Sequence, residues 1–211
     1  MSKVCVIYGA GEVFPACKKI KAELVIAADG GYAKAVKDGY APDVVIGDFD
    51  SSEAPTDTEA FVIKLSRVKD DTDTLAAIKT GLRRGCDAFV IFGGVGGRLD
   101  HTVANFGALA YLNAFGAHGY LVDRDSVATV VTDEKFTIPN KAFGTVSVFA
   151  YGGDAEGVTL ENLDYTLDKA TLYPHVPIGV SNNRRAVENA KPAKISVEHG
   201  TLLIFFPRFT R

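Results

Sequence analysis

In the first half of the chain, several aspartates directly follow runs of apolar residues. The motif "GDFDSS" (47–52) follows one such run directly, "AADGG" (27–31) ends another, and "KDDTDT" (69–74) leads into a helical pattern. Carboxylates that converge within about 4 Å repel by roughly 1 to 4 kcal/mol per pair, so they need a counter-charge. Oxygen ligands without a nearby Cys or His pair favour Mg²⁺ over Zn²⁺. The aspartates concerned are Asp29, Asp48, Asp50, Asp70, Asp71, Asp73 and Asp100.

A Mg²⁺ ion held in this way shares its remaining positions with water and phosphate oxygens, which indicates a nucleotide as the ligand. The motif "GGVGGRLDH" (93–101) adds backbone amides, Arg98, Asp100 and His101 at a helix start, a setting suited to an anion. Each motif also has a purely structural interpretation. "GDFD" is then a turn, Thr72 or one aspartate a helix cap, and the glycines a flexible turn. Three aspartates within "DDTD", however, exceed what a helix cap requires.

The elements that position these residues alternate between strands and helices over the first 130 or so residues. Short apolar runs rich in β-branched and aromatic residues predict strands at 3–8, 23–28, 43–47, 61–65, 88–94 and 119–123. Two helical patterns predict helices at 73–85 and 101–116, with core-facing positions at Leu75, Ile78, Leu82, Val103, Phe106 and Ala110. This alternation predicts an α/β fold with an open parallel sheet and helices on both faces.

Loops that follow parallel strands lie along one edge of the sheet, so the carboxylates are expected to share one rim. In "GDFDSS" we expect an extended chain, whose side chains alternate with period two. Asp48 and Asp50 would then face one cation, while Phe49 points the opposite way into apolar packing. The spacing excludes a dinucleotide fingerprint and a P-loop, because neither G-x-G-x-x-G nor Gly-Lys-Ser/Thr occurs.

The second half of the chain has a different pattern. After about Asp133, apolar and polar residues alternate and are interrupted by Gly, Pro and Asn, which predicts a smaller antiparallel β-sandwich. We place the boundary between 133 and 134, giving domains 1–133 and 134–211. The stretch "SNNRRAVENAKPAK" (181–194) is interpreted as only a polar connection.

Composition excludes several classes of protein. The 47% hydrophobic fraction, 23% charged fraction and net charge of −3 are typical of a soluble globular protein, without the basic excess that nucleic-acid binding requires. The start of the chain has about five apolar residues before Gly9, too few for a signal-peptide core, and no run approaches the ~18 of a membrane span. Cys5, Cys17 and Cys86 share no CxxC spacing and are interpreted as reduced thiols, which predicts a cytoplasmic protein.

Taken together, the motifs resemble one enzyme family. "ADGG" (28–31), "GDFDS" (47–51), "KDDTD" (69–73), "GGVGGRLDH" (93–101) and "GVSN" (179–182) occur in an order similar to that of thiamine pyrophosphokinases. The resemblance covers nearly the whole chain. It implies a nucleotide-binding catalytic domain at 1–133, followed by a thiamine-binding and dimerisation domain. It also implies a homodimer with shared active sites, which transfers a diphosphate group from ATP to the hydroxyl of thiamine and releases AMP.

The resemblance, together with the motifs themselves, predicts roles for individual residues. The expected Mg²⁺ ligands are Asp48, Asp50 and Asp73. The expected ATP-binding residues are Asp29, Lys69, Thr72, Arg98, Asp100 and His101. Ser181 and Asn182 are expected in the thiamine region. The expected catalytic residues are Asp71, Asp73 and Asp100. Such transfer depends mainly on positioning and electrostatics, and Asp71 or Asp100 is the candidate if a general base acts.

Three functions remain open at this point. Besides thiamine, another hydroxymethyl heterocycle such as a pterin is a possible acceptor for the same carboxylate rim. A module that senses nucleotides without catalysis is the third interpretation. The chain contains no Trp, whereas eukaryotic members of the family carry one in the C-terminal domain. An aromatic contact to thiamine would therefore come from Phe or Tyr.

Overall fold

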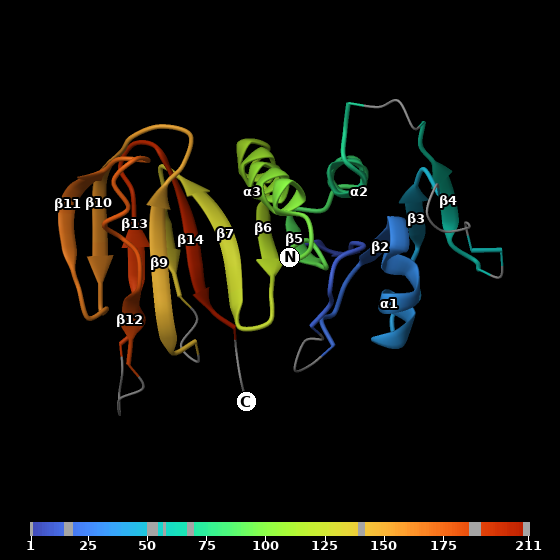
Figure 1. The fold of residues 1–211 in the computed structure, drawn as a ribbon, viewed down its shortest axis with the longest axis horizontal. Coiled ribbons are helices and arrows are strands. Elements are labelled where there is room, and N and C mark those ends of the chain that lie inside the picture. The colour runs from blue at the N-terminus through green and yellow to red at the C-terminus, as the bar shows by residue number, and fades with distance from the viewer. Residues whose placement is uncertain are drawn as a thin grey trace. The chain divides into compact units, whose positions relative to one another are not determined.

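The computed structural model describes residues 2–14, 19–49, 55–56, 58–66, 70–138, 142–185 and 191–208. The chain divides into two compact units, Met1–Arg124 and Asp125–Arg211 (Figure 1). The first unit combines strands with helices, and the second consists of strands. Within the described ranges, no helix is long and apolar enough to cross a membrane.

The first unit contains a parallel sheet. Its strands are β1 (Val4–Tyr8), β2 (Leu24–Ala28), β3 (Val44–Gly47), β4 (Phe61–Lys64), β5 (Ala88–Phe92) and β6 (His118–Val122). They lie in the order β6-β5-β1-β2-β3-β4, and every neighbouring pair is parallel. The order reverses between β1 and β5, because the chain runs outward from β1 to β4 and returns to the other side of β1. The predicted open parallel sheet is confirmed.

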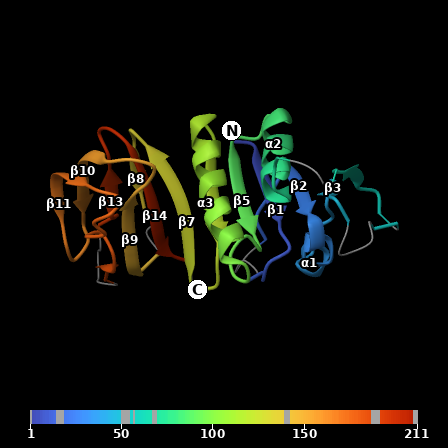
Figure 2. The same ribbon diagram turned by 45° about the horizontal axis from the view of Figure 1, so that its top comes forward.

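Helices cover both faces of this sheet (Figures 1 and 2). They are α1 (Tyr32–Lys37), which follows the short 3₁₀ turn Asp29–Gly31, α2 (Asp73–Arg83) and α3 (Leu99–Ala114). Gly81 of α2 packs against Cys5, whereas the hydroxyl of Tyr8 donates to Asp38, just after α1, at 3.0 Å. Cys5 and Tyr8 are an odd number of residues apart in β1, so they face opposite sides of the sheet. Helices α1 and α2 therefore lie on opposite faces.

The core-facing side of α3 differs from the prediction. Val103 is 57% exposed, and Phe106 and Ala110 are only half-buried. The buried positions are Asn105, Ala108, Leu109 and Leu112. The apolar residues of α3 are distributed over most of its circumference, so their spacing in the sequence does not identify one buried face. Packing against β6 and α2 decides which side of the helix is buried. In α2 the prediction is confirmed for Ile78, while Leu75 and Leu82 lie half-buried at the margin.

The second unit is a β-sandwich. Its strands are β7 (Ser126–Thr132), β8 (Lys135–Thr137), β9 (Gly144–Ala150), β10 (Ala155–Glu161), β11 (Leu167–Leu172), β12 (Asn182–Arg184), β13 (Lys194–Ser196) and β14 (Thr201–Pro207). Two antiparallel layers have the orders β12-β9-β14-β7 and β11-β10-β13-β8. Phe136 of one layer packs on Phe206 of the other, with 5.5 Å between ring centroids. The predicted antiparallel sandwich is confirmed.

Two segments of this unit differ from their sequence interpretation. Strand β7 lies on the N-terminal side of the predicted boundary, yet it pairs along its whole length with β14. The stretch 181–194, interpreted as a polar connection, contains β12 and the buried Arg184, which is 2% exposed. The guanidinium of Arg184 donates to the carbonyl oxygens of Ala142 and Lys191 and lies 4.8 Å from the ring centroid of Phe143. Ala142 and Phe143 are distant from Arg184 in sequence, so the local pattern could not reveal the burial.

Candidate active site at the carboxyl ends of the parallel strands

Several predicted site residues lie where strands of the first unit end. Asp29 follows β2 directly, Asp48 follows β3, and Arg98 closes the glycine-rich loop after β5. The first two loops are in contact, because Gly47 lies against the backbone of Asp29, where a Cβ on the glycine would be 3.3 Å from the aspartate Cα. The structure therefore places the loops of Asp29 and Asp48 side by side at one edge of the sheet, as predicted from strand order.

Two predicted residues, Asp50 and Lys69, lie outside the described residues. Within the described part of the chain, no group of three or more His, Cys, Asp or Glu side chains is arranged to hold a metal ion. Asp48 supplies carboxylate oxygens at the strand ends, the donor type that Mg²⁺ prefers. The metal site stays a prediction.

The backbone of the two aspartate loops is unusual. Asp29 has a φ of +50° and Phe49 a φ of +56°, both in the left-handed region that residues other than glycine rarely adopt. Such conformations concentrate at functional sites, where surrounding contacts hold them. The left-handed Phe49 also corrects the sequence argument about "GDFD". The chain turns at Phe49 instead of running extended, so period-two alternation does not orient the side chains there.

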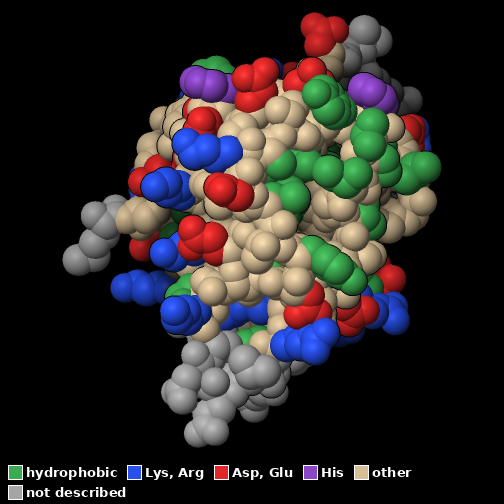
Figure 3. Space-filling model, turned by 90° about the vertical axis from the view of Figure 1, so that its left-hand side faces the viewer, with side chains coloured by type: hydrophobic (Ala, Val, Ile, Leu, Met, Phe, Trp, Pro, Cys, Tyr) green, Lys and Arg blue, Asp and Glu red, His purple; other side chains and the backbone are tan. Residues whose placement is uncertain are grey.

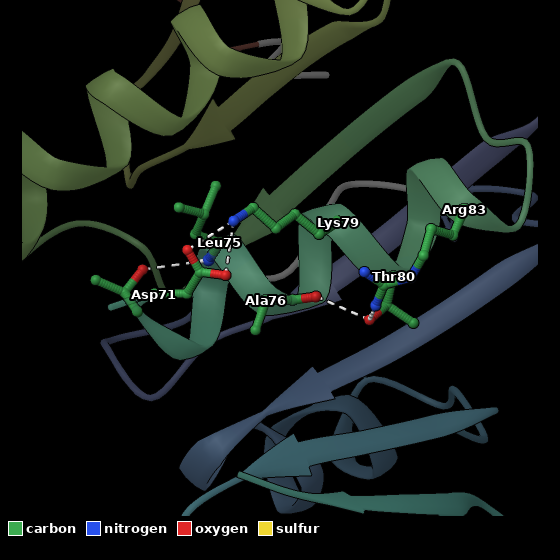
Figure 4. Close-up of polar contacts among 7 residues, drawn as sticks. Asp71, Leu75, Ala76, Lys79, Thr80 and Arg83 are labelled. Atoms are coloured by element: carbon green, nitrogen blue, oxygen red, sulfur yellow. Dashed lines mark hydrogen bonds and ion pairs between the residues drawn. The ribbon is translucent and has the colours of Figure 1, made fainter. Parts of the chain in front are cut away.

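The described part of the "KDDTDT" segment, residues 70–74, leads into α2, which begins at Asp73 (Figure 4). Both carboxylate oxygens of Asp71 accept hydrogen bonds from the ammonium of Lys79 at 2.7 Å, and Asp71 raises the pKa of that ammonium. The hydroxyl of Thr72 caps α2 by accepting the N–H of Leu75 at 3.2 Å. Asp73 is the first residue of the helix. Of the predicted residues here, Asp71 and Thr72 precede α2 and bind residues within it, and Asp73 lies at the helix start.

Arg98 and Asp100 bind each other at the start of α3. The guanidinium donates to the two carboxylate oxygens at 3.2 and 2.6 Å, and the backbone N–H of His101 also donates to Asp100, at 3.0 Å. The two side chains are 72% and 63% exposed. The adjacent guanidinium lowers the pKa of Asp100. An aspartate with a lowered pKa is a weak proton acceptor, so the geometry favours a charge-positioning role over general-base catalysis for Asp100.

This arrangement gives a test for Arg98. In Arg98→Lys the charge remains, but the planar fork that suits two phosphate oxygens is lost, so we expect the KM for ATP to rise by about tenfold. Arg83, at the end of α2, donates to Thr80 of that helix at 3.1 Å and serves as a matched control. We expect Arg83→Lys to change the KM for ATP by less than about twofold. Equal, small effects in steady-state kinetics would assign Arg98 a surface role.

Sequence reasoning did not predict the close approach of two glycine loops at the point where the strand order reverses. The N–H of Gly9 donates to the carbonyl oxygen of Phe92 at 2.8 Å, and that of Gly11 to Gly93 at 2.9 Å. A Cβ on Gly9 or Gly11 would lie 2.8 or 2.5 Å from the Gly93 oxygen, so only glycine permits this approach. Both glycine loops directly follow strands, which the sequence shows, but their contact joins two neighbouring strands and has no local signal.

Two side chains from helices hold these glycine loops. The ammonium of Lys34 on α1 donates to the carbonyl oxygens of Ala10 and Gly11 after β1. The buried amide of Asn105 on α3 donates to the carbonyl oxygen of Gly94 after β5 at 2.7 Å. Neither residue was predicted. Each contacts backbone far away in the sequence, so no local pattern identifies it.

Acidic residues also occur at the opposite edge of the sheet, where their role is structural. Glu23 accepts the N–H of Val4 at 2.8 Å, and Asp43 accepts that of Val25 at 2.7 Å. Both acids immediately precede a strand, and both satisfy backbone donors near the start of the neighbouring strand. Position relative to the strand therefore separates the two kinds of carboxylate. Acids before strands complete the sheet, and acids after strands lie at the candidate site.

The second unit contains the two residues predicted for the thiamine region. Ser181 is exposed, has a φ of +58°, and its N–H donates to the hydroxyl of Ser147 at 3.1 Å. The amide of Asn182 is buried, accepts the N–H of Tyr165 at 3.0 Å and donates to the carbonyl oxygen of Tyr165 at 2.6 Å. Asn182 thereby fixes the backbone of Tyr165, whose side chain is 73% exposed.

Hydrophobic side chains gather on the β11 side of this unit, the face shown in Figure 3. Among the described residues of the second unit as a whole, the exposed large hydrophobic side chains are Phe143, Tyr165, Tyr173, Val176, Ile178 and Val180. Exposed aromatic rings of this kind offer flat apolar surface to a heterocycle. Tyrosine and phenylalanine are thus available in place of the missing tryptophan.

Two family models match the chain, one within each of its two compact units. Residues 18–120 match the family model "Thiamin pyrophosphokinase, catalytic domain", and residues 134–202 match "Thiamin pyrophosphokinase, vitamin B1 binding domain". No curated protein matches the chain in sequence.

Solved structures extend the comparison to the whole chain. The thiamine pyrophosphokinase of Bacillus subtilis is similar with a TM-score of 0.84 and 21% identity, over 99% of this chain and 100% of that one. That of Geobacillus thermodenitrificans gives 0.81 and 23%, over 97% of each chain. The Candida albicans enzyme gives 0.73 and 14%, over 98% of this chain and 89% of that one. At these identities the similarity establishes the fold.

Proposed function

The chain belongs to the thiamine pyrophosphokinase family, and we propose that it makes thiamine diphosphate by transferring a diphosphate group from ATP to the hydroxyl of thiamine. AMP is the second product, and Mg²⁺ is the metal. The observation that carries this proposal is the pair of family matches, one within each part of the chain, together with the loops that meet at the carboxyl ends of β1, β2, β3 and β5.

The reaction proposed is an in-line displacement. The hydroxyl oxygen of thiamine forms a bond to the β-phosphorus of ATP, and the bond from that phosphorus to the oxygen it shares with the α-phosphorus breaks. AMP leaves with this oxygen, and the hydroxyl proton passes to water. In the described structure Asp71 is paired with Lys79, and Asp100 with Arg98. We therefore propose that positioning and electrostatics, and no strong base, supply the rate acceleration.

The chain's own residues have distinct roles in this proposal. Arg98 turns part of its guanidinium fork from Asp100 to phosphate oxygens, which offsets negative charge on the departing group. Asp48, Asp50 and Asp73 would hold Mg²⁺, which neutralises phosphate charge when bound. Ser181 and the loop fixed by Asn182 contribute to thiamine binding. The homodimer with shared sites, the cytoplasmic location and the domain roles assigned to 1–133 and 134–211 are part of the same proposal.

Product identification tests this function against its alternatives. The purified chain is incubated with ATP, Mg²⁺ and either thiamine or a hydroxymethylpterin, and the products are identified by mass spectrometry. Thiamine diphosphate with an equal amount of AMP supports the proposal. ADP with thiamine monophosphate contradicts diphosphate transfer, and product from the pterin alone favours the second acceptor class. Absence of AMP with every acceptor favours a nucleotide-sensing module.

A further inference from the structure

A lysine on α1 contacts the loop that follows β1. The ammonium of Lys34 donates to the carbonyl oxygens of Ala10 and Gly11. Its side chain is half-buried, and this burial lowers the pKa of the ammonium, while the nearby carboxylate of Asp29 opposes the shift. Lys34 is therefore a positive charge held among backbone carbonyls, beside a residue predicted to bind ATP.

The loop that Lys34 contacts is locked to the loop that follows β5. Gly11 donates to Gly93 at 2.9 Å, and both glycines lack the space for a Cβ. Strands β1 and β5 are the neighbours at which the strand order reverses, and ligands of open parallel sheets bind in the crevice at this point. The chain continues from Gly93 to Arg98. A displacement of the β1 loop would therefore change the position of the β5 loop as well.

Electrostatics gives Lys34 a second effect at this crevice. The carbonyl oxygens of Ala10 and Gly11 carry partial negative charge, and Asp29 carries a full one. Each would repel a triphosphate that approaches the carboxyl ends of the strands. The ammonium of Lys34 offsets the negative charge of the two carbonyl oxygens and of Asp29, because it binds the carbonyls directly and lies near the carboxylate. Charge-assisted hydrogen bonds of this kind are strong in a half-buried setting.

We propose that Lys34 is a positioning residue for the nucleotide: it holds the β1 loop against the β5 loop and offsets the negative charge of the Ala10 and Gly11 carbonyl oxygens. This inference rests on the proposed use of ATP. It assigns no contact between Lys34 and the reacting atoms. Lys34 acts through the loop that it holds.

Three variants test the role of Lys34. Lys34→Met removes the charge and keeps an unbranched side chain that favours helix, and Lys34→Arg keeps the charge and the donors. Lys37→Met, at an exposed position of the same helix, is the matched control. Each variant is measured for ATP affinity by calorimetry without thiamine, for the KM of each substrate, and for Tm.

We expect Lys34→Met to weaken ATP binding by about tenfold or more, and to leave the KM for thiamine within about twofold. Lys34→Arg should recover most of the ATP affinity, and Lys37→Met should bind ATP as the wild type does. Unchanged ATP affinity in Lys34→Met would overturn the proposal. Equal losses for both substrates with a lowered Tm would also overturn it, since they indicate a merely structural residue.

Two further comparisons keep the result decisive. If Lys34→Met does not fold, Lys34→Gln replaces it, because the glutamine amide still donates to a carbonyl oxygen but carries no charge. The same selective loss of ATP affinity is expected for Lys34→Gln. ATP binding without thiamine separates this inference from the proposed function. A wild-type chain that binds ATP but forms no thiamine diphosphate contradicts the reaction and leaves the comparison among the Lys34 variants valid.

Discussion

Asp48→Asn is expected to lower turnover by about a hundredfold and to raise the Mg²⁺ concentration needed for half-maximal rate. Asp48 follows β3 at the edge where the β2 and β3 loops meet, beside the left-handed Phe49. Asparagine keeps the shape of the side chain and removes the charge that a divalent cation requires. The fold should be unaffected, because the residue lies beyond the end of the strand. A titration of rate against Mg²⁺ measures both effects, and the same result is expected for Asp50→Asn.

The matched control lies at the other end of the same strand. Asp43 precedes β3 and accepts the N–H of Val25 at 2.7 Å, a bond that the oxygen of an asparagine can still accept. Asp43→Asn is therefore expected to keep wild-type turnover and Mg²⁺ dependence. Near-normal turnover with unchanged Mg²⁺ dependence in Asp48→Asn would exclude this residue as a metal ligand.

The second large effect is expected from mixed dimers. If each active site combines residues of two subunits, then Asp73→Asn and Asn182→Ala, each inactive alone, should restore activity when they are co-expressed. In a mixed dimer one site collects both substitutions and the other carries neither. With equal amounts and random pairing, half of the dimers are mixed and half of their sites are intact, so about a quarter of the wild-type activity should return. Two affinity tags isolate the mixed dimers, which should then show about half of the wild-type activity per dimer.

The structure sharpens the choice of substitutions for this experiment. Asn182 binds the backbone of Tyr165 through two hydrogen bonds from its buried amide, so Asn182→Ala disturbs the Tyr165 loop as well as the predicted substrate residue. A Tm measurement shows whether that variant folds. Tyr165→Ala, which removes the exposed ring alone, is the second partner for Asp73→Asn. Mixed dimers that are confirmed by both tags and remain inactive would show that each site is built within one chain.

Much of the fold could be predicted because its signals are local. The short β-branched runs and the helical patterns between them predicted a parallel sheet with helices on both faces, and the later alternation predicted an antiparallel sandwich. Placing Asp29 and Asp48 at one edge required only the rule that parallel strands end together. The prediction for α3 was wrong at Val103, because a helix with apolar residues on most sides has no single face in its sequence.

The partners of individual side chains at the candidate site could not be predicted from residue spacing. Asp71, just before α2, pairs with Lys79 within that helix, and Arg98 pairs with Asp100. Phe49 turns left-handed where an extended chain was expected. These outcomes depend on rotamers and on loop conformation, which spacing does not specify.

The sequence by itself determined which residues follow strands, and hence that aspartates, glycines and an arginine lie along one edge of a parallel sheet. Only the tertiary structure decided how that edge is held together. Lys34 contacts Ala10 and Gly11 across the space between α1 and β1, and Gly11 contacts Gly93 across two neighbouring strands. Strand ends are set by local periodicity. Such contacts, in contrast, join residues distant in the chain, and they form only after the sheet has brought its strands side by side.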